Sequence, residues 1–259
     1  MRRVVIPELL DTDTGTPREV HGSLADLRMI NRYFGGVRTM ANLIHTVAAQ
    51  SRIKTVSWLD VGGGSGDVAA LARRSLIRQG IDVNPVLLDR MPAHMAAPAH
   101  AKTARALDTP AMTTPTRAKT ARVLGAPAVN GHYPSIGGDA LALPFKDNSF
   151  DVVGCCLFIH HLEPEQVVQF VDQALRVARH AVLINDVIRH PLHLALAYAG
   201  YAIYRSRLTR HDAVASVRRA YTLDEIEKML RQTHAARIEA RTFFSFRMGV
   251  IAWKNPNMT

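Results

Sequence analysis

A glycine-rich loop directly after a β-rich segment constrains this chain more than any other feature. Thr55–Val61 is rich in β-branched and aromatic residues, and residues 68–78 have the apolar spacing of an amphipathic helix. Between these two segments stand Gly62, Gly63, Gly64, Ser65 and Gly66. Glycine has no Cβ, so such a loop lets the backbone approach a ligand where the helix begins. The pattern predicts a strand, a ligand-binding loop and a helix.

The following sequence continues this alternation of strands and helices. Residues 83–89, 148–159 and 181–186 are predicted as strands, and the nearly continuous apolar run of residues 148–159 suits a strand that is buried on both faces of a sheet. Residues 163–179, between the last two of these strands, have helical periodicity. Alternation of this kind predicts a parallel sheet with helices on both faces.

Two further strand-like runs, residues 236–246 and Arg247–Trp253, follow each other with no helix between them. Such neighbours form an antiparallel hairpin, which we expect at one edge of the sheet. The sequence therefore predicts a Rossmann-like α/β fold with a seven-stranded, mostly parallel sheet and an antiparallel C-terminal hairpin.

The segment before the first strand is helical in its periodicity. Within residues 23–50, Ser23 is the expected N-terminal cap because Asp26 follows it by three residues. A pair of glycines interrupts the segment, so we expect two helices. We assign residues 1–50 to an N-terminal helical cap and residues 51–259 to one α/β domain.

Residues 92–134 break the alternation with a composition dominated by Ala, Thr, Pro, Lys and Arg. Within this segment, residues 101–111 recur with small changes as residues 118–128, which indicates a tandem duplication with a period of 17 residues. Long loops close at modest entropic cost, so a fold tolerates such an insert. We expect a surface linker, and a lid over the substrate or a partner is the alternative.

Composition and charge limit the partners of this chain. The net charge of +10 suits an anionic partner. The basic residues are spread along the chain, and no stacking aromatic residues alternate with them, so we do not expect nucleic acid binding. The apolar stretch at residues 192–204 is too short to span a bilayer, although it suits a peripheral membrane contact.

The two cysteines, Cys155 and Cys156, are adjacent in a predicted strand. Neighbouring side chains of a strand point to opposite faces, so these thiols cannot pair with each other. The sequence after Met1 has no apolar core of the kind a signal peptide needs. We expect buried free thiols and a cytoplasmic location.

The glycine loop alone does not identify its ligand. A dinucleotide-binding loop has the spacing G-x-G-x-x-G, but Asp67 stands here in place of the third glycine. Asp89, at the end of the second strand, is placed to accept hydrogen bonds from the two hydroxyls of a ribose. These features fit both adenosine-containing cofactors, a nicotinamide dinucleotide and S-adenosylmethionine.

Later motifs separate these two cofactors. They are Gly-Asp-Ala-Leu-Ala-Leu-Pro-Phe at residues 138–145, Ser-Phe-Asp-Val-Val at 149–153 and His-His-Leu at 160–162. Together with the loop and Asp89, they resemble the class I S-adenosylmethionine-dependent methyltransferases, in family order, from about residue 55 to 190. The chain is similar in particular to small-molecule methyltransferases of ubiquinone and menaquinone biosynthesis. The insert is a departure, because Asp89 and Asp139 are usually closer in sequence in this family.

The resemblance implies S-adenosylmethionine as the cofactor. Gly62, Gly64 and Gly66 would line its methionine part, Asp89 would bind the ribose, and Asp139 would accept from the adenine amino group. The predicted cofactor contacts are Arg32, Asp60, Gly62, Gly63, Gly64, Ser65, Gly66, Asp89, Arg90, Met91, Asp139, Ala140, Leu141 and Cys156.

The acceptor is expected at the carboxyl ends of the later strands, where ligands bind in open α/β sheets. Imidazole titrates near neutral pH, so histidines here are candidate bases, with helix capping or packing as the alternative role. These candidates are His160, His161, His190 and His211. The spacing of His190 and His193 suits a metal, but no third ligand is evident, so we predict no metal site.

Residues 187–222 are expected to roof the acceptor pocket, with a solvated basic face as the alternative. The apolar start of this segment favours a small, apolar, phenolic or quinone-like acceptor, as in secondary metabolism. O-methylation is the first expectation and C-methylation the second. The alternative functions are a nucleotide-dependent oxidoreductase and a protein that binds S-adenosylmethionine without catalysis.

Overall fold

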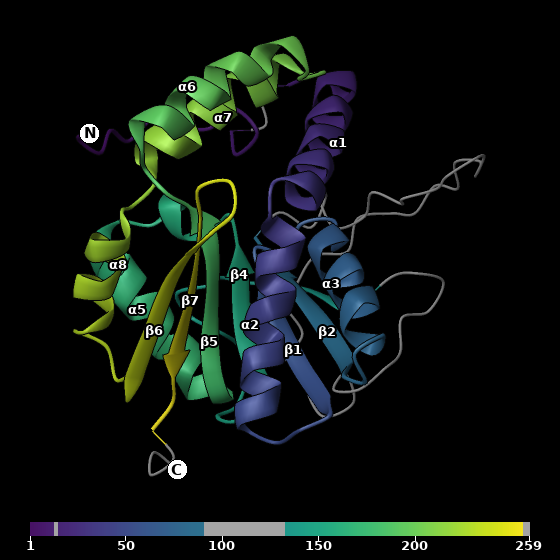
Figure 1. Ribbon diagram of the computed structural model, residues 1–259, viewed down its shortest axis with the longest axis vertical. Coiled ribbons are helices and arrows are strands. Elements are labelled where there is room, and N and C mark those ends of the chain that lie inside the picture. The colour runs from purple at the N-terminus through teal and green to yellow at the C-terminus, as the bar shows by residue number, and fades with distance from the viewer. Residues whose placement is uncertain (13–14, 91–132, 256–259) are drawn as a thin grey trace, which may run out of the picture.

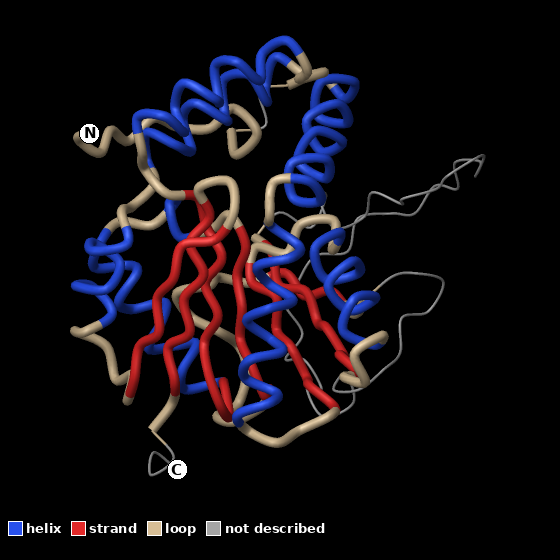
Figure 2. The backbone as a smooth tube through the Cα atoms, in the orientation of Figure 1, coloured by secondary structure: helices blue, strands red, loops and turns tan. Residues whose placement is uncertain are grey.

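The computed structural model describes residues 1–12, 15–90 and 133–255, which form one seven-stranded sheet with helices around it (Figures 1 and 2). The strand order is β3-β2-β1-β4-β5-β7-β6, and all pairs are parallel except the two that β7 makes. The strands are β1 (Thr55–Val61), β2 (Asp82–Asp89), β3 (Ser135–Gly137), β4 (Phe150–Cys156), β5 (Ala178–Val187), β6 (Arg237–Phe243) and β7 (Arg247–Trp253). The predicted sheet and its antiparallel hairpin are confirmed.

The sheet is buried on both faces because alternate residues of its central strands point into different cores. In β1, Val56 and Trp58 join the core on one face, whereas Leu59 and Val61 join the core on the other. The helices on the first face are α2 (Gly36–Gln50) and α3 (Asp67–Ile77), and those on the second face are α5 (Pro164–Val177) and α8 (Leu223–Leu230) (Figure 1).

A layer of helices lies over the carboxyl ends of the parallel strands (Figure 1). Asp26 accepts hydrogen bonds from the backbone N–H groups of Arg205 and Ser206, which binds the first helix to the start of the last helix of this layer. The layer consists of α1 (Pro17–Tyr33), α6 (Pro191–Ala199), the 3-10 helix η3 (Gly200–Ala202) and α7 (Arg207–Arg219).

Residues 3–10 run beneath this layer and are held by long-range contacts. The backbone N–H of Val4 donates to the carbonyl oxygen of Arg218 at 3.0 Å. The backbone N–H groups of Leu9 and Leu10 donate to the carboxylate of Asp212 at 2.8 and 3.1 Å. The segment is therefore fixed to α7.

The first helix begins earlier than the sequence predicted. Its cap is Thr16, not Ser23, because the side chains and backbone N–H groups of Thr16 and Glu19 form a reciprocal capping box. Ser23 lies inside α1, is buried, and accepts a hydrogen bond from the hydroxyl of Thr209. A serine in a helix interior is thus used here for packing against α7.

The predicted N-terminal cap of residues 1–50 divides into two parts. Helix α1 belongs to the layer above the strands, but α2 packs on the sheet. Its residues Met40, Ile44 and Val47 are fully buried in the same core as Trp58. Helix α2 is therefore part of the α/β domain, because its apolar face covers the sheet.

Three further expectations concern the insert, a membrane span and the two cysteines. Of the predicted insert, residues 92–134, only Tyr133 and Pro134 are described, and they lead into β3. No helix in the described ranges has the length and apolar character that crossing a bilayer requires. Cys155 and Cys156 are free thiols, as predicted.

Candidate cofactor and acceptor site

The glycine loop turns between β1 and α3, where the strand order reverses. Gly62, Gly64 and Gly66 have φ angles of +69°, +49° and +74°, which residues with a Cβ rarely adopt. A Cβ on Gly62 or Gly66 would come within 2.9 Å of Phe158 or Leu87. A Cβ on Gly64 would meet no atom of the described residues within 4 Å. The loop therefore presents open space at Gly64.

Asp89 lies beside this loop at the carboxyl end of β2. Its Oδ2 atom accepts a hydrogen bond from the N–H of Gly64 at 3.0 Å. The N–H of Gly62 donates to the carbonyl oxygen of Leu88 at 2.8 Å. These bonds hold the loop against β2 and place the Asp89 carboxylate next to the open space at Gly64.

Asp60 lies beneath the loop, within β1. Its side chain is 1% exposed, and a Cβ built on Gly63 would be 3.3 Å from its Oδ2 atom. Its Oδ1 atom has no hydrogen-bond partner among the described residues. Burial, together with the charge of Asp89, raises the pKa of Asp60 to about 8. A buried acceptor of this kind matches a ligand group that donates hydrogen bonds or carries positive charge.

The predicted adenine-binding residues share an edge of the sheet with Asp89. They follow β3, where Gly137 pairs with Asp89. Asp139 is exposed, and its Oδ1 atom accepts a hydrogen bond from the N–H of Leu141 at 2.9 Å. Ala140 is buried in the core below. The turn is therefore close in the fold to the glycine loop, although the insert separates the two in sequence.

Three other predicted contacts have less distinctive surroundings. The hydroxyl of Ser65 donates a hydrogen bond to Asp67. Arg90 is exposed directly after β2. Met91 lies outside the described residues.

Arg32, also predicted to contact the cofactor, lies at the outer side of the helices. Its guanidinium is 5.4 Å from the centre of the Tyr33 ring. It lines a cavity of about 640 Å³ between α2 and α3, together with Arg38 and Arg74, and no residue of the glycine loop lines this cavity. A contact of Arg32 with the cofactor stays a prediction.

Cys156 is part of a polar cluster that sequence reasoning missed. Its Sγ atom lies 3.4 Å from the amide nitrogen of Asn185. Arg247 is 1% exposed and donates to the side-chain oxygen of Asn31 at 3.0 Å, and Asn185 donates to the carbonyl oxygen of Gly36 at 2.7 Å. Burial raises the pKa of the Cys156 thiol to about 12, so the thiol stays protonated. No local motif links these residues, which are far apart in sequence.

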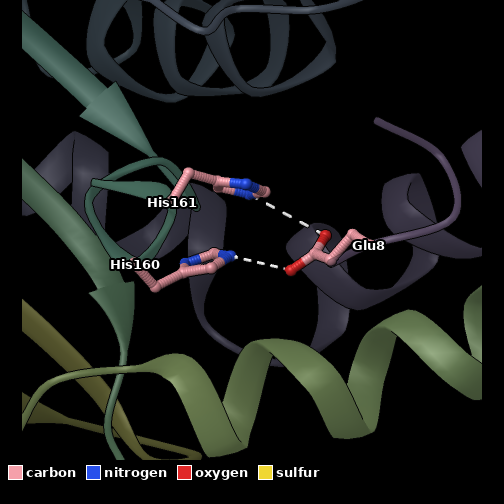
Figure 3. Close-up of side chains that lie close together, drawn as sticks. All are labelled: Glu8, His160 and His161. Atoms are coloured by element: carbon pink, nitrogen blue, oxygen red, sulfur yellow. Dashed lines mark hydrogen bonds and ion pairs between the residues drawn. The ribbon is translucent and has the colours of Figure 1, made fainter. Parts of the chain in front are cut away.

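His160 lies in the 3-10 helix η2 (Ile159–His161), directly after β4. Its Nε2 atom is 3.2 Å from Glu8 (Figure 3). Its Nδ1 atom is 2.7 Å from Asp186. Burial alone would lower the pKa of His160, but these two carboxylates outweigh it and raise the pKa to about 10. A protonated ring with both nitrogens engaged has no lone pair to accept a proton. The arrangement favours a positioning role over that of a base.

His161 is more exposed, at 21% of its side chain, and it faces the same glutamate. Its Nε2 atom is 3.8 Å from Glu8, and its Nδ1 atom is 2.9 Å from Asp11 (Figure 3 shows the glutamate and both histidines). Arg219 donates to the backbone carbonyl oxygen of His161 at 2.6 Å. Sequence reasoning missed Glu8 and Asp11, because these acids follow no motif.

His190 lies with His193 against the ring of Phe246, which stacks with both imidazoles at centroid distances of 5.1 and 5.2 Å. The Nδ1 atom of His190 accepts from the N–H of Leu192, so His190 caps α6. The Nδ1 atom of His193 is 3.0 Å from the carbonyl oxygen of Ile188. Burial lowers the pKa of His193, which is therefore neutral near pH 7.

His211 lies in α7, apart from the other candidate bases. Its Nδ1 atom is 2.9 Å from the carboxylate of Asp212, which also accepts from the backbone of the N-terminal segment. The candidates thus form three groups in the structure. His160 and His161 face Glu8, His190 faces Phe246, and His211 faces Asp212.

Comparison with known families matches the central part of the chain. Residues 59–184 match the model of a methyltransferase domain family. The matched range extends from β1 into β5 and includes the glycine loop, Asp89, Asp139 and the two histidines of η2. A comparison with proteins of curated function gives no match.

Solved structures with the same fold include two that align over nearly the whole chain. The plantazolicin methyltransferase BpumL, solved with S-adenosylhomocysteine, is 13% identical with a TM-score of 0.59, over 96% of this chain and 95% of that one. An O-methyltransferase family 2 protein from Planctomyces limnophilus, solved with apigenin, is 14% identical with a TM-score of 0.54. That alignment covers 93% of this chain and 63% of the other. At these identities the likeness establishes the fold.

Proposed function

We propose that this chain, whose residues 59–184 match a methyltransferase domain family, is a class I methyltransferase that transfers the methyl group of S-adenosylmethionine to a small, apolar acceptor. The observation that carries the proposal is the buried side chain of Asp60, whose Oδ1 atom has no hydrogen-bond partner among the described residues, beneath a glycine loop that is open at Gly64. The ammonium group of S-adenosylmethionine is a donor of the kind that this carboxylate needs.

The other residues of the loop edge match the remaining parts of this cofactor. The Asp89 carboxylate, beside Gly64, suits the hydroxyls of the ribose. The exposed Asp139 carboxylate suits the adenine amino group. When bound, the sulfonium supplies an electrophilic methyl group, and the protein contributes by orienting the acceptor in line with it and by excluding water.

An apolar acceptor is supported by the surface of α6 and η3. Leu192, Leu196, Tyr198 and Tyr201 leave between 37% and 56% of their surface exposed on these two elements. Such residues suit the aromatic ring of a phenol or quinone precursor. The Planctomyces protein was solved with apigenin, and a phenolic oxygen is the first choice here as well. An activated ring carbon is the second choice.

For a phenolic acceptor, His193 is the base that the geometry supports best. A carbonyl oxygen only accepts hydrogen bonds, so the contact with Ile188 requires a proton on Nδ1 of His193. In the neutral ring, Nε2 then carries the lone pair that a general base needs. His190 has the opposite tautomer when neutral, because its Nδ1 accepts from Leu192. It would donate from Nε2 and suits orientation of an acceptor oxygen.

Calorimetric titration with S-adenosylhomocysteine, NADH and NADPH tests the cofactor. We expect binding of S-adenosylhomocysteine alone. Asp89→Ala should weaken this binding by about 1–3 kcal/mol, as expected for a lost acceptor of charged hydrogen bonds. Asp82→Ala, at the other end of β2, is the matched control and should bind as the wild type does. Binding of a nicotinamide nucleotide instead would indicate an oxidoreductase, and equal affinity of the Asp89 variant would remove that residue from the site.

Turnover with a panel of phenols and quinone precursors then tests catalysis. Methyl transfer to any member, with S-adenosylhomocysteine as the second product, supports the proposed reaction. Binding of S-adenosylhomocysteine without turnover of any member would favour a cofactor-binding protein that has no catalytic role.

A further inference from the structure

Glu8, His160 and His161 form a cluster that the proposed methyl transfer does not use (Figure 3). Each residue offers one ligand atom, and these atoms lie within 4.8 Å of one another. It is the one group of three or more such ligands that the described residues contain. Ligand atoms that share a tetrahedral ion are separated by roughly 3.4 Å, given metal–ligand distances of about 2.1 Å. Nε2 of His160 is 3.2 Å from Oε1 of Glu8, and Nε2 of His161 is 3.8 Å from Oε2, and both distances are close to this value.

The two imidazoles are oriented as metal ligands usually are. Each turns its Nε2 atom to Glu8 and its Nδ1 atom to a second carboxylate. Asp186 lies 2.7 Å from His160 Nδ1, and Asp11 lies 2.9 Å from His161 Nδ1. Histidine ligands commonly donate their second N–H to a carboxylate, which fixes the tautomer and strengthens the ligand. Here two such pairs converge on one glutamate.

The charge around the cluster also suits a cation. With both imidazoles neutral, the charged groups in contact with the cluster are the carboxylates of Glu8, Asp11 and Asp186 and the guanidinium of Arg219. Two negative charges then remain in excess, which one divalent ion balances. Arg219 contacts the Nδ1 side and the backbone of His161, so it does not occupy the space between the Nε2 atoms and Glu8.

We propose that Glu8, His160 and His161 bind one divalent transition-metal ion, with a further coordination position open to water. Two imidazoles and one carboxylate are a donor set that suits Zn²⁺ and other first-row divalent ions. Residues 3–10 are connected through this ion to η2, at the carboxyl ends of β4 and β5. When no metal is bound, His160 is protonated and forms ion pairs with the same carboxylates.

The test is a titration of tag-free, chelator-treated protein with Co²⁺, followed by visible absorption and by displacement with Zn²⁺. We expect one ion per chain, with the intense absorption of a four- or five-coordinate site. Glu8→Gln and His161→Gln each remove a ligand and should abolish stoichiometric binding. Asp11→Asn should weaken it by about 10- to 100-fold, because it removes only the partner of a ligand.

His234→Gln provides the matched control. His234 is also paired with an aspartate, Asp172, at 3.0 Å, but no third potential metal ligand lies beside it among the residues that the structure describes. This variant should bind Co²⁺ as the wild type does. Because the readout is metal binding, it is independent of S-adenosylmethionine and of turnover.

Two results would overturn the proposal. One is the absence of stoichiometric Co²⁺ and Zn²⁺ binding by the wild-type protein, which would leave the cluster as an ion pair. The other is binding that survives in both ligand variants. Circular dichroism shows whether each variant is folded. If Glu8→Gln is not, His161→Gln decides the question, because the His161 side chain is partly exposed and less deeply packed.

Discussion

At the scale of single residues, the glycine loop and a distant turn offer a matched pair of substitutions. Gly64 and Gly80 both have positive φ angles, +49° and +79°, and no described atom lies within 4 Å of a Cβ at either position. Alanine at each site should cost roughly 1–2 kcal/mol of folding free energy, which thermal unfolding measures.

The two variants should differ in cofactor binding. The Cβ of Gly64→Ala enters the space that we assign to S-adenosylmethionine, so its affinity for S-adenosylhomocysteine should fall at least tenfold. Gly80→Ala, in the turn before β2, should keep the wild-type affinity. Equal affinities in calorimetry would show that the open space at Gly64 is not the cofactor site.

Asp60 should make stability depend on pH in a direction opposite to that of most carboxylates. Its pKa is about 8 when folded and about 3.8 when unfolded, so the folded state holds the proton more tightly. This contribution to stability is fully present below pH 3.8 and is lost as the pH rises through 8.

The comparison of wild type with Asp60→Asn isolates this effect from other titrating groups. Urea unfolding from pH 5 to 9 should show the variant gaining stability relative to wild type as the pH rises, by roughly 1.4 kcal/mol for each pH unit up to about pH 8. A difference that is constant over this range would show that Asp60 is already ionised. Saturation with S-adenosylhomocysteine should reduce the difference, because its ammonium group supplies positive charge beside Asp60.

His193 should matter for turnover but not for cofactor binding. With a phenolic acceptor, His193→Gln should lower kcat at neutral pH by about 10²- to 10⁴-fold, while the Kd of S-adenosylhomocysteine stays unchanged. The deficit should shrink as the pH approaches the pKa of the phenol, because the acceptor then ionises without a base. A neutral-pH kcat equal to that of wild type would exclude this role.

At the scale of elements, the sequence predicted segments whose signals are local. β7, for example, has the expected bounds. Strand β3 and helix α7 were not identified. β3 has three residues, too few for a pattern, and the apolar positions of α7 are diluted by its many charged residues. The prediction of a cap at Ser23 was wrong because both Thr16 and Ser23 are followed by an acid three residues later, and the helix begins after Thr16.

Local sequence signals likewise identified only part of the candidate site. Asp60, the glycines and Asp89 lie within 30 residues of one another, so their spacing alone indicates a common site. Glu8 and Arg247 reach their partners only through the fold, across separations of 152 and 216 residues. A single charged residue gives no sequence signal for such a contact. The prediction of no metal site therefore did not take these long-range partners into account.

The insert between β2 and β3 can be tested at this scale. Residues 87–89 pair with residues 135–137, so the segment leaves and re-enters the sheet at one edge. Deleting residues 101–117, one copy of the repeat, changes the loop-closure free energy by only about 0.6 kcal/mol. Turnover and S-adenosylhomocysteine affinity should therefore stay at wild-type values. A collapse of turnover in a folded variant would assign the insert to a lid.

At the scale of the whole molecule, residues 3–10 connect with partners that come much later in the chain. Arg3 donates to the carbonyl oxygen of Arg219 and pairs with Glu163. Glu8 contacts His160, and Leu9 donates to Asp212. Every one of these partners lies beyond β4, so the segment is held by the second half of the α/β domain and by the layer above it.

This arrangement has a consequence during biosynthesis. Ribosomes add about 5–20 residues per second, so roughly 8–30 seconds pass between the synthesis of Glu8 and that of His160, 152 residues later. The segment must remain undocked while the first strands assemble, and it can dock fully only after its partners up to Arg219 have been made. A segment that docks late commonly opens before the core of the fold does. Hydrogen exchange should therefore show the amides of Val4 and Leu9 opening well before those of β4, with the rest of the protein still folded.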